Sequence, residues 1–188
     1  MKISRWAQTL ILAVAAITGA TYSHAENPQV ALTTEFGVIE LELMPSLAPR
    51  TVQNFLDLVD DEFYDGLVFH RVIANFMIQA GGYTSELTYK PAPDTVPNES
   101  FNGLKNKRGT VAMARMTDPD SASSQFFINV RNNPSLNADG TEAGYTVFAK
   151  VSAGMDVVSK IELVNTHLKN GMAAVPEDPV IIISIRRL

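Results

Sequence analysis

Residues 69–82 read Phe-His-Arg-Val-Ile-Ala-Asn-Phe-Met-Ile-Gln-Ala-Gly-Gly, and this stretch decides the fold that we expect. Short apolar runs flank Ala74-Asn75, and asparagine tolerates a left-handed turn, so the pattern predicts a strand–turn–strand. The guanidinium of Arg71 is the one permanent cation in the run, and it is costly to bury unless it is paired or solvated. Strand alternation directs Arg71 and Gln79 away from the side chains that pack inside. We therefore expect an apolar surface pocket in which the guanidinium of Arg71 offers hydrogen-bond donors in a fixed geometry.

The first 25 residues have the three parts of a secretory signal peptide. Lys2 and Arg5 give a positive start, residues 10–17 form an apolar run, and small residues precede the expected cleavage point after Ala25. The apolar run is far shorter than the ~20 residues that a membrane anchor needs. We therefore expect export, one domain over residues 26–188, and no stable membrane association once the signal is removed.

The composition excludes several classes of protein. Removing 25 of the 188 residues takes away two of the 15 basic residues and none of the 20 acidic ones, which leaves 13 against 20 and a formal charge of −7. A chain this acidic repels phosphate backbones, so we expect no nucleic-acid partner. The absence of cysteine excludes disulfides and favours the bacterial periplasm for an exported chain. His70 and His167 lack metal-ligand spacing, so we expect no metal.

Periodic patterns along the chain indicate a mainly β protein with two helices. Alternation of apolar and polar side chains marks the strands, and a helical stripe begins at Pro49, where a missing N–H costs nothing. The patterns predict strands at residues 30–34, 37–43, 110–114, 125–130, 146–151 and 180–185, helices at 49–60 and 154–164, and long loops at 84–108 and 132–144. The last strand is continuously apolar, which predicts burial on both faces. Many short strands with two helices indicate a closed antiparallel barrel capped by the helices.

Four motifs in fixed order resemble those of the cyclophilins, a family of peptidyl-prolyl cis–trans isomerases. The motifs are Phe69-His70-Arg71-Val72-Ile73, Phe76-Met77-Ile78-Gln79, Ala112-Met113-Ala114 and Ser124-Gln125-Phe126-Phe127-Ile128. The resemblance covers nearly all of the chain after residue 25 and is greatest to the exported bacterial members. It implies a closed eight-stranded antiparallel barrel capped by two α-helices. Because side chains fill such a barrel, the site would lie on its outer face.

The resemblance also implies a role for each matching residue. Arg71 would be the catalytic residue and Gln79 would orient it, with no cofactor. Substrate binding would involve Phe76, Met77, Phe127 and Leu136 in a proline pocket, Ala114 and Arg115 beside the residue before proline, Gln125 on the peptide backbone, and Tyr145. Tyr145 could equally belong to the barrel rim. The partners would be proline-containing unfolded or partly folded polypeptides, bound by a monomer.

Two other functions use the same residues. A chaperone that binds proline-containing peptides with little turnover would need the same pocket. A hydrolase would use His70, but the chain has no Gly-x-Ser-x-Gly nucleophile elbow, and a lone histidine on a strand is more often a hydrogen-bonded structural residue. Turnover of an Ala-Pro peptide without cleavage separates an isomerase from both.

Three positions depart from the family pattern. Ala80 replaces a usual glycine, which is expected to constrain the backbone, and Ala74-Asn75 replaces a frequent Pro-Gly turn. Ser135 stands where cyclosporin-sensitive members have tryptophan and bacterial ones often have phenylalanine. We therefore expect weak cyclosporin binding and a more open pocket rim.

Overall fold

The computed structural model describes residues 26–188, so the predicted signal peptide lies outside the described residues. The main elements are β1 (Gln29–Thr34), β2 (Gly37–Leu43), α1 (Pro49–Asp60), β3 (Arg71–Ile73), β4 (Met77–Ala80), β5 (Thr110–Met113), β6 (Phe126–Asn129), β7 (Val147–Ala153), α2 (Met155–Glu162), β8 (Thr166–Lys169), β9 (Met172–Pro176) and β10 (Ile182–Arg187). Short 3-10 turns cover Pro119–Ser121 and Pro134–Leu136. The prediction of a mainly β chain with two helices is confirmed.

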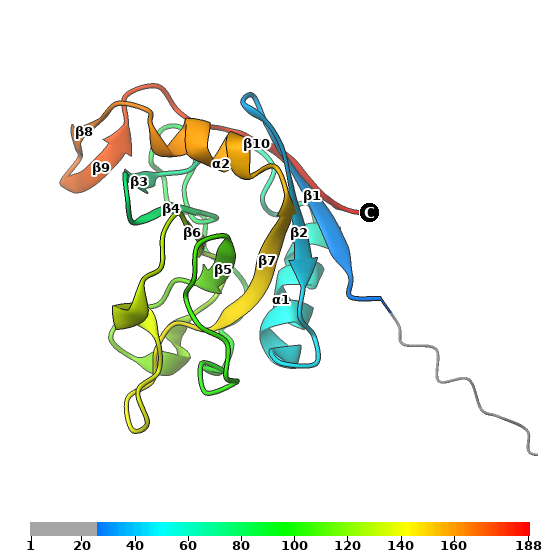
Figure 1. The fold of residues 1–188 in the computed structure, drawn as a ribbon. Helices are drawn as coiled ribbons and strands as arrows, with labels where there is room; N and C mark the ends of the chain where they lie inside the picture. Colours follow the sequence, from blue (N-terminus) through cyan, green and yellow to red (C-terminus); the bar gives the residue numbers. More distant parts are fainter. Residues whose placement is uncertain (1–25) are drawn as a thin grey trace, which may run out of the picture.

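Eight of the strands form one antiparallel sheet in the order β10-β1-β2-β7-β5-β6-β4-β3. Within residues 26–188, the edge strands β10 and β3 do not pair with each other, so the sheet is an open half-barrel. The predicted closed barrel is therefore wrong, although the eight antiparallel strands and the two helices are confirmed. Figure 1 shows α1 and α2 at opposite ends of the curved sheet.

Main-chain hydrogen bonds join residues 66–69 to residues 180–182, beside the two edges of the sheet, without forming a strand pair. Val68 and Ile181 form an isolated bridge near these edges, before β3 and β10 begin. On one side of the bridge, the N–H of Gly66 donates to the carbonyl of Ile182 at 2.9 Å and the N–H of Ile182 to that of Leu67 at 2.8 Å, while the N–H of Leu67 turns back to the carbonyl of Tyr64 at 3.1 Å. On the other side, the N–H of Phe69 donates to the carbonyl of Val180 at 2.9 Å, and the pairing does not continue into β3.

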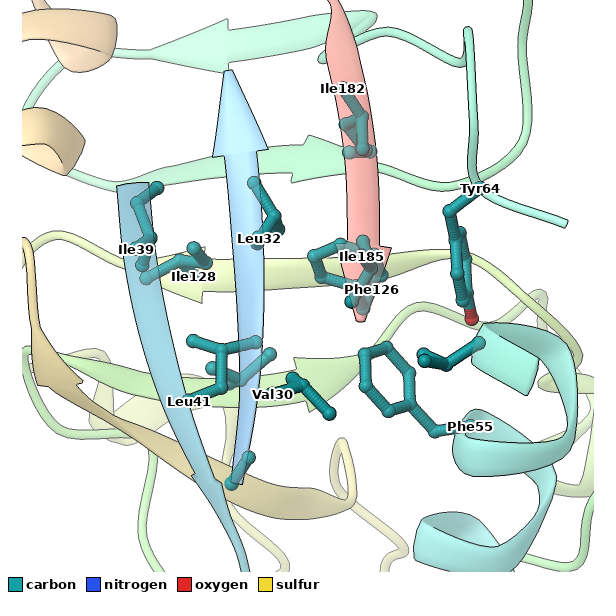
Figure 2. Packing of buried hydrophobic residues seen from close by; sticks show 14 of the residues in the cluster. Val30, Leu32, Ile39, Leu41, Phe55, Tyr64, Phe126, Ile128, Ile182 and Ile185 are labelled. Atoms are coloured by element: carbon teal, nitrogen blue, oxygen red, sulfur yellow. The ribbon is translucent and has the colours of Figure 1, made fainter. Parts of the chain in front are cut away.

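The main core is formed by the inner face of the sheet and by α1. Helix α1 has the predicted bounds, and its Phe55 lies between sheet and helix in Figure 2. The ring of Phe55 meets that of Phe126 edge-on, with centroids 5.7 Å apart, and lies 5.3 Å from that of Tyr64. Alternate residues of β1 and β2 complete this layer: Val30, Leu32, Ile39, Leu41 and Leu43 are fully buried. The period-two pattern in the sequence therefore identified the inward face correctly.

Strand β10 is buried on one face only. Ile182 and Ile185 are almost fully buried, but Ile183 between them is 54% exposed. The predicted burial on both faces is therefore wrong. Helix α1 packs near β10 on the core side, and an antiparallel sheet commonly leaves its other face in water.

A second sheet of two strands, β8 and β9, has no counterpart in the sequence-based prediction. Asn170 and Gly171 form its turn with φ of 53° and 80°, the left-handed geometry that an Asn-Gly hairpin favours. Figure 1 shows this hairpin beside β3. The Asn-Gly dipeptide was the signal that could have predicted it. Among residues 26–188, no helix is both long and apolar enough to cross a membrane.

Candidate active site

The β3–β4 hairpin places Arg71 and Gln79 side by side on the outer face of the sheet. Asn75 adopts φ of 56° in the turn, as predicted, and Arg71 pairs with Gln79 in the register of the two strands. Val72 and Ile78 point into the core and are almost fully buried, whereas Arg71 and Gln79 are half-buried. Nη1 of Arg71 donates to Oε1 of Gln79 at 3.4 Å, a long hydrogen bond.

Gln79 is itself held by Gln125, which precedes β6. Nε2 of Gln79 donates to Oε1 of Gln125 at 2.9 Å. The side chain of Gln125 lies against the backbone of Gly82, where a Cβ atom would come within 2.6 Å of its Cγ. Gly82 therefore leaves the space that this glutamine occupies. A chain of contacts thus runs from Gly82 through the two glutamines to Arg71.

A second, smaller apolar cluster lies on the outer face and forms the floor of the site. Met77, Ala112, Phe127 and Val147 form its buried centre, separate from the main core. Phe126 and Phe127 are neighbours in β6, and because alternate side chains point to opposite faces, the first enters the main core and the second enters this cluster. The sheet thus has apolar layers on both faces here, and the outer one stays open to ligands.

A pocket of about 140 Å³ opens above this cluster. Its lining residues are Arg71, Phe76, Met77, Gln79, Ala114, Arg115, Phe127, Leu136 and Tyr145. The structure therefore brings together nine of the ten predicted site residues, Tyr145 among them, and Gln125 lines an adjoining hollow of about 200 Å³ that shares Gln79, Ala114 and Arg115. Drug-sized ligands occupy about 300–1,000 Å³, so the first pocket suits a single small ring.

A larger hollow, of about 300 Å³, lies near Phe36 and Leu163. Its charged lining residues are all carboxylates: Glu35, Glu177 and Asp178. It offers no cationic donor beside an apolar floor, so we take the Arg71 pocket as the candidate site.

The two guanidinium groups at this pocket differ in their hydrogen bonding to the protein. Arg115 donates from Nη2 to the carbonyl of Ala143 at 2.7 Å, from Nη1 to that of Met116 at 2.9 Å, and from Nε to that of Gly144 at 3.2 Å. Its Cζ also lies 4.8 Å from the ring centroid of Tyr145. Arg71 has one hydrogen-bond partner among residues 26–188, Gln79. Arg71 is therefore available to a ligand, whereas Arg115 is committed to the protein.

Three buried asparagines behind the pocket were not predicted. Nδ2 of Asn129 donates to Oδ1 of Asn106 at 3.1 Å, and Nδ2 of Asn133 donates to Oδ1 of Asn129 at 2.7 Å. The network also holds the pocket wall, because Asn133 donates to the carbonyl of Phe76 at 2.9 Å and Asn106 to that of Leu136 at 3.0 Å. An asparagine inside the apolar run of residues 126–130 was the available signal, since a buried amide needs partners.

A family comparison accounts for this arrangement. Residues 29–187 match the family model described as cyclophilin type peptidyl-prolyl cis-trans isomerase/CLD. The chain belongs to the cyclophilin-type peptidyl-prolyl cis–trans isomerases. The prediction from the four motifs is therefore confirmed, and the family and its named members indicate peptidyl-prolyl isomerase activity.

Bacterial cyclophilins are similar over most of their length. A peptidyl-prolyl cis-trans isomerase of Acinetobacter baylyi is 51% identical over 160 residues, covering 85% of each chain. Peptidyl-prolyl cis-trans isomerase B of Escherichia coli is 46% identical over 159 residues, 83% of this chain and 97% of that one. A crystal structure of a Cryptosporidium parvum cyclophilin superposes with a TM-score of 0.73 at 26% identity, covering 86% of this chain and 98% of that chain.

His70 of this cyclophilin is buried beside the site and does not line the pocket. It is 3% exposed, and its ring centroid lies 4.6 Å from that of Tyr83. Burial lowers the pKa of His70 to about 4, and the nearby charge of Arg71 acts in the same direction. Its Nδ1 has no hydrogen-bond partner among the described residues, whereas hydrogen bonds of the imidazole with Val68 and Gln125 act on its pKa in the opposite direction. A neutral, enclosed imidazole does not support the hydrolase hypothesis.

The departures from the usual cyclophilin pattern have separate consequences. Ala80 lies in β4 and is fully buried, while Gly81 after it adopts φ of 90°. The left-handed position thus falls on the glycine, and Ala80 is not among the residues with positive φ, so the expected constraint does not arise there. Ser135 is exposed in the turn that carries Leu136.

Proposed function

We propose that Arg71 accelerates rotation about Xaa–Pro bonds by donating hydrogen bonds to the twisted prolyl amide. Rotation is slow because it breaks amide resonance, at a cost of about 18–20 kcal/mol. In the twisted state the prolyl nitrogen regains its lone pair and becomes an acceptor. A donor that reaches the nitrogen only in this state binds the transition state in preference to the planar amide. The guanidinium of Arg71 stays charged and offers several donors, so it can also bind the prolyl carbonyl.

The contrast between the two arginines carries this proposal. Arg115 and Arg71 both line the pocket, but Arg115 donates to main-chain carbonyls, whereas the Arg71 side chain makes one hydrogen bond, of 3.4 Å, within the described part of the chain. The strand pairing with Gln79 holds Arg71 in place without using up its donors. This is the state required of a group that must form its best bonds with a transient species.

Typical hydrogen-bond energies indicate that Arg71 and the apolar pocket both contribute to the rate acceleration. A charge-assisted hydrogen bond contributes about 1.5–3 kcal/mol, and each tenfold in rate requires about 1.4 kcal/mol. One bond therefore accounts for ~10- to 100-fold. Any further acceleration comes from the apolar floor, where Met77 and Phe127 are almost fully buried. This floor holds the pyrrolidine ring and strengthens the bonds of Arg71 by excluding water.

We propose proline-containing segments of unfolded or partly folded polypeptides as substrates. A solved cyclophilin of C. parvum in the presence of the dipeptide Ala-Pro superposes with a TM-score of 0.71 at 27% identity. The hollow beside Gln125 adjoins the proline pocket and shares Gln79, Ala114 and Arg115 with it, so an extended peptide can occupy both. The protein would bind such segments as a monomer.

We also propose that the clients are exported proteins of a bacterial periplasm. Residues 1–25 support this through their charged start, apolar run and small residues before Ala25. Cell fractionation of the full chain, followed by N-terminal sequencing, tests the proposal. A mature protein that begins at Glu26 in the periplasmic fraction is the expected result, and an intact chain in the cytoplasm contradicts it.

NMR exchange spectroscopy on an Ala-Pro peptide tests the activity directly. Faster cis–trans exchange with an unchanged peptide mass is the expected result. Line broadening from binding without faster exchange would indicate a peptide-holding chaperone. New peptide termini would indicate a hydrolase.

A further inference from the structure

The part of this acidic protein that carries the proline pocket has a positive charge. Residues 67–84 and 101–145 build the pocket and its support, Tyr145 included. They contain six cations, which are Arg71, Lys105, Lys107, Arg108, Arg115 and Arg131, and four carboxylates, which are Asp118, Asp120, Asp139 and Glu142. The other seven of the 13 basic residues share the rest of residues 26–188 with the other 16 acidic ones. The pocket-bearing segments thus have a charge of +2 and the rest has −9.

Four of these cations form a surface that we call the basic patch: Lys105, Lys107, Arg108 and Arg131. All four are exposed. Among residues 26–188, none of them forms an ion pair, whereas Lys150, Lys160, Arg186 and Arg187 all do. The N–H of Arg108 donates to Oδ1 of Asn132 at 2.9 Å, which places the two segments side by side. Unpaired cations on neighbouring segments add their potentials.

The basic patch is attached directly to one wall of the pocket. Asn106, between Lys105 and Lys107, donates to the carbonyl of Leu136 at 3.0 Å. The N–H of Val130, beside Arg131, donates to the carbonyl of Phe76 at 3.2 Å. Phe76 and Leu136 line the pocket, but neither lines the adjoining hollow near Gln125. A peptide that fills the hollow and then the pocket therefore continues over these two residues toward the basic patch.

Five carboxylates lie near this path. Asp118 and Asp120 are beside the hollow, since they fall between its lining residues Met116 and Ser121. Asp139 and Glu142 lie in the loop that leads to Tyr145, where the N–H of Asp139 donates to the carbonyl of Glu142 at 3.2 Å. Glu162 of α2 accepts a hydrogen bond at 2.7 Å from the N–H of Asn75. Among residues 26–188, none of these five forms an ion pair with the basic patch. The positive charge of the basic patch is therefore not neutralised by these carboxylates and can attract an acidic partner.

We infer that the basic patch binds acidic residues beside the proline of a client polypeptide, and so favours substrates with carboxylates on one flank. This inference rests on the proposed isomerase function of the pocket. Exposed ion pairs are individually weak, so the patch acts mainly by raising the encounter rate and the residence of acidic segments. The rest of the molecule, at −9, repels such segments elsewhere and directs them to the pocket face.

Exchange rates of a set of Ala-Pro peptides test the inference. One peptide is neutral, two have a pair of Glu residues before or after the Ala-Pro unit, and two have Lys pairs at the same places. At low salt, we expect kcat/KM for one of the two Glu peptides to exceed that of the neutral peptide by about three- to tenfold. The matching Lys peptide should be slower, and both differences should shrink at about 0.5 M salt.

Charge-reversal variants locate the effect on the surface. In K107E/R108E, the ratio of kcat/KM for the favoured Glu peptide to that for the neutral one should fall to about one or below. The matched control K160E/K169E has the same change in net charge on α2 and β8, and it should keep the wild-type ratio. If K107E/R108E unfolds, K105Q/R131Q replaces it, since both side chains are exposed and outside any ion pair.

The outcomes distinguish this inference from the function on which it rests. Failure to accelerate even the neutral peptide would overturn the proposed function. Equal acceleration of all five peptides, or an equal loss of the ratio in K160E/K169E, would overturn the inference alone. Binding to phosphatidylglycerol vesicles that K107E/R108E abolishes, with no preference among the peptides, would assign the patch to a lipid surface instead and also overturn it.

Discussion

The guanidinium of Arg115 lies against the ring of Tyr145, with its Cζ 4.8 Å from the ring centroid. The same guanidinium donates to the carbonyls of Ala143 and Gly144, the two residues before that tyrosine. Tyr145 in turn meets Phe127 edge-on, with centroids 5.7 Å apart. One side chain therefore joins the segment just after β5 to the loop before β7 and fixes the ring that closes one side of the pocket.

Replacing Arg115 should loosen this side of the pocket. Hydrogen bonds from a charged donor contribute more than neutral ones, so we expect R115A to lower the free energy of unfolding by about 1–3 kcal/mol. The KM for an Ala-Pro peptide should rise more than kcat falls, because Arg71 is untouched. R115K should recover little, since an ammonium cannot reproduce the planar fork. Urea unfolding and isomerase kinetics measure both effects, and a wild-type KM in R115A would contradict the positioning role.

Replacing Arg71 should instead remove the catalytic step. We expect R71A to lower kcat/KM for an Ala-Pro peptide by at least about tenfold, the equivalent of one charge-assisted hydrogen bond. Its thermal unfolding should stay near that of the wild type, because the Arg71 side chain makes one long hydrogen bond within residues 26–188. R71K, which keeps the charge and loses the fork, is the matched control and should remain impaired. A folded R71A with near wild-type activity would refute the mechanism.

The sequence predicted the strands and helices of this molecule better than it predicted whether the sheet closes into a barrel. The left-handed Asn75 and the bounds of α1 followed from local chemistry, and the family resemblance assigned Phe127 and Leu136 to the pocket from distant positions. The open edge could not be predicted, because it depends on which carbonyls the main-chain N–H groups of Gly66 and Leu67 reach. The hydrogen bonds that Arg115 makes within the protein could not be predicted for the same reason. Its partners are main-chain oxygens, which have no signature in the order of side chains.

The buried asparagine network should be essential for stability. N129L keeps a similar volume but leaves Oδ1 of Asn106 and Nδ2 of Asn133 without this partner in a buried place. We expect a loss of about 2–5 kcal/mol in the free energy of unfolding, since unpaired buried polar groups are costly. Asn165 is exposed, and N165L should stay within about 0.5 kcal/mol of the wild type. Equal urea midpoints for the two variants would contradict this role.

His70 should make the stability depend on pH. Burial lowers its pKa to about 4 in the folded state, against 6.5 without burial. Between these values the unfolded chain binds a proton that the folded chain does not, so the free energy of unfolding falls as the pH falls, by up to about 3 kcal/mol. Urea unfolding between about pH 7 and pH 4.5 should show a steeper fall for the wild type than for H70Q. Parallel curves would show that His70 does not contribute.

Ser135 gives the last prediction, a gain of binding. Tryptophan stands at the matching position in cyclosporin-sensitive cyclophilins, whereas here an exposed serine precedes Leu136 at the edge of the pocket. We expect weak inhibition of the wild type by cyclosporin and an affinity at least about tenfold higher in S135W, because a large aromatic ring adds apolar contact area at the rim. S135A is the control, since it removes the hydroxyl without adding a ring, and it should bind as weakly as the wild type. Inhibition constants from the isomerase assay test this prediction. Tight inhibition of the wild type would show that cyclosporin binding does not need an aromatic ring at the rim. An inhibition constant that is the same in S135W and the wild type would show that another part of the pocket prevents cyclosporin binding.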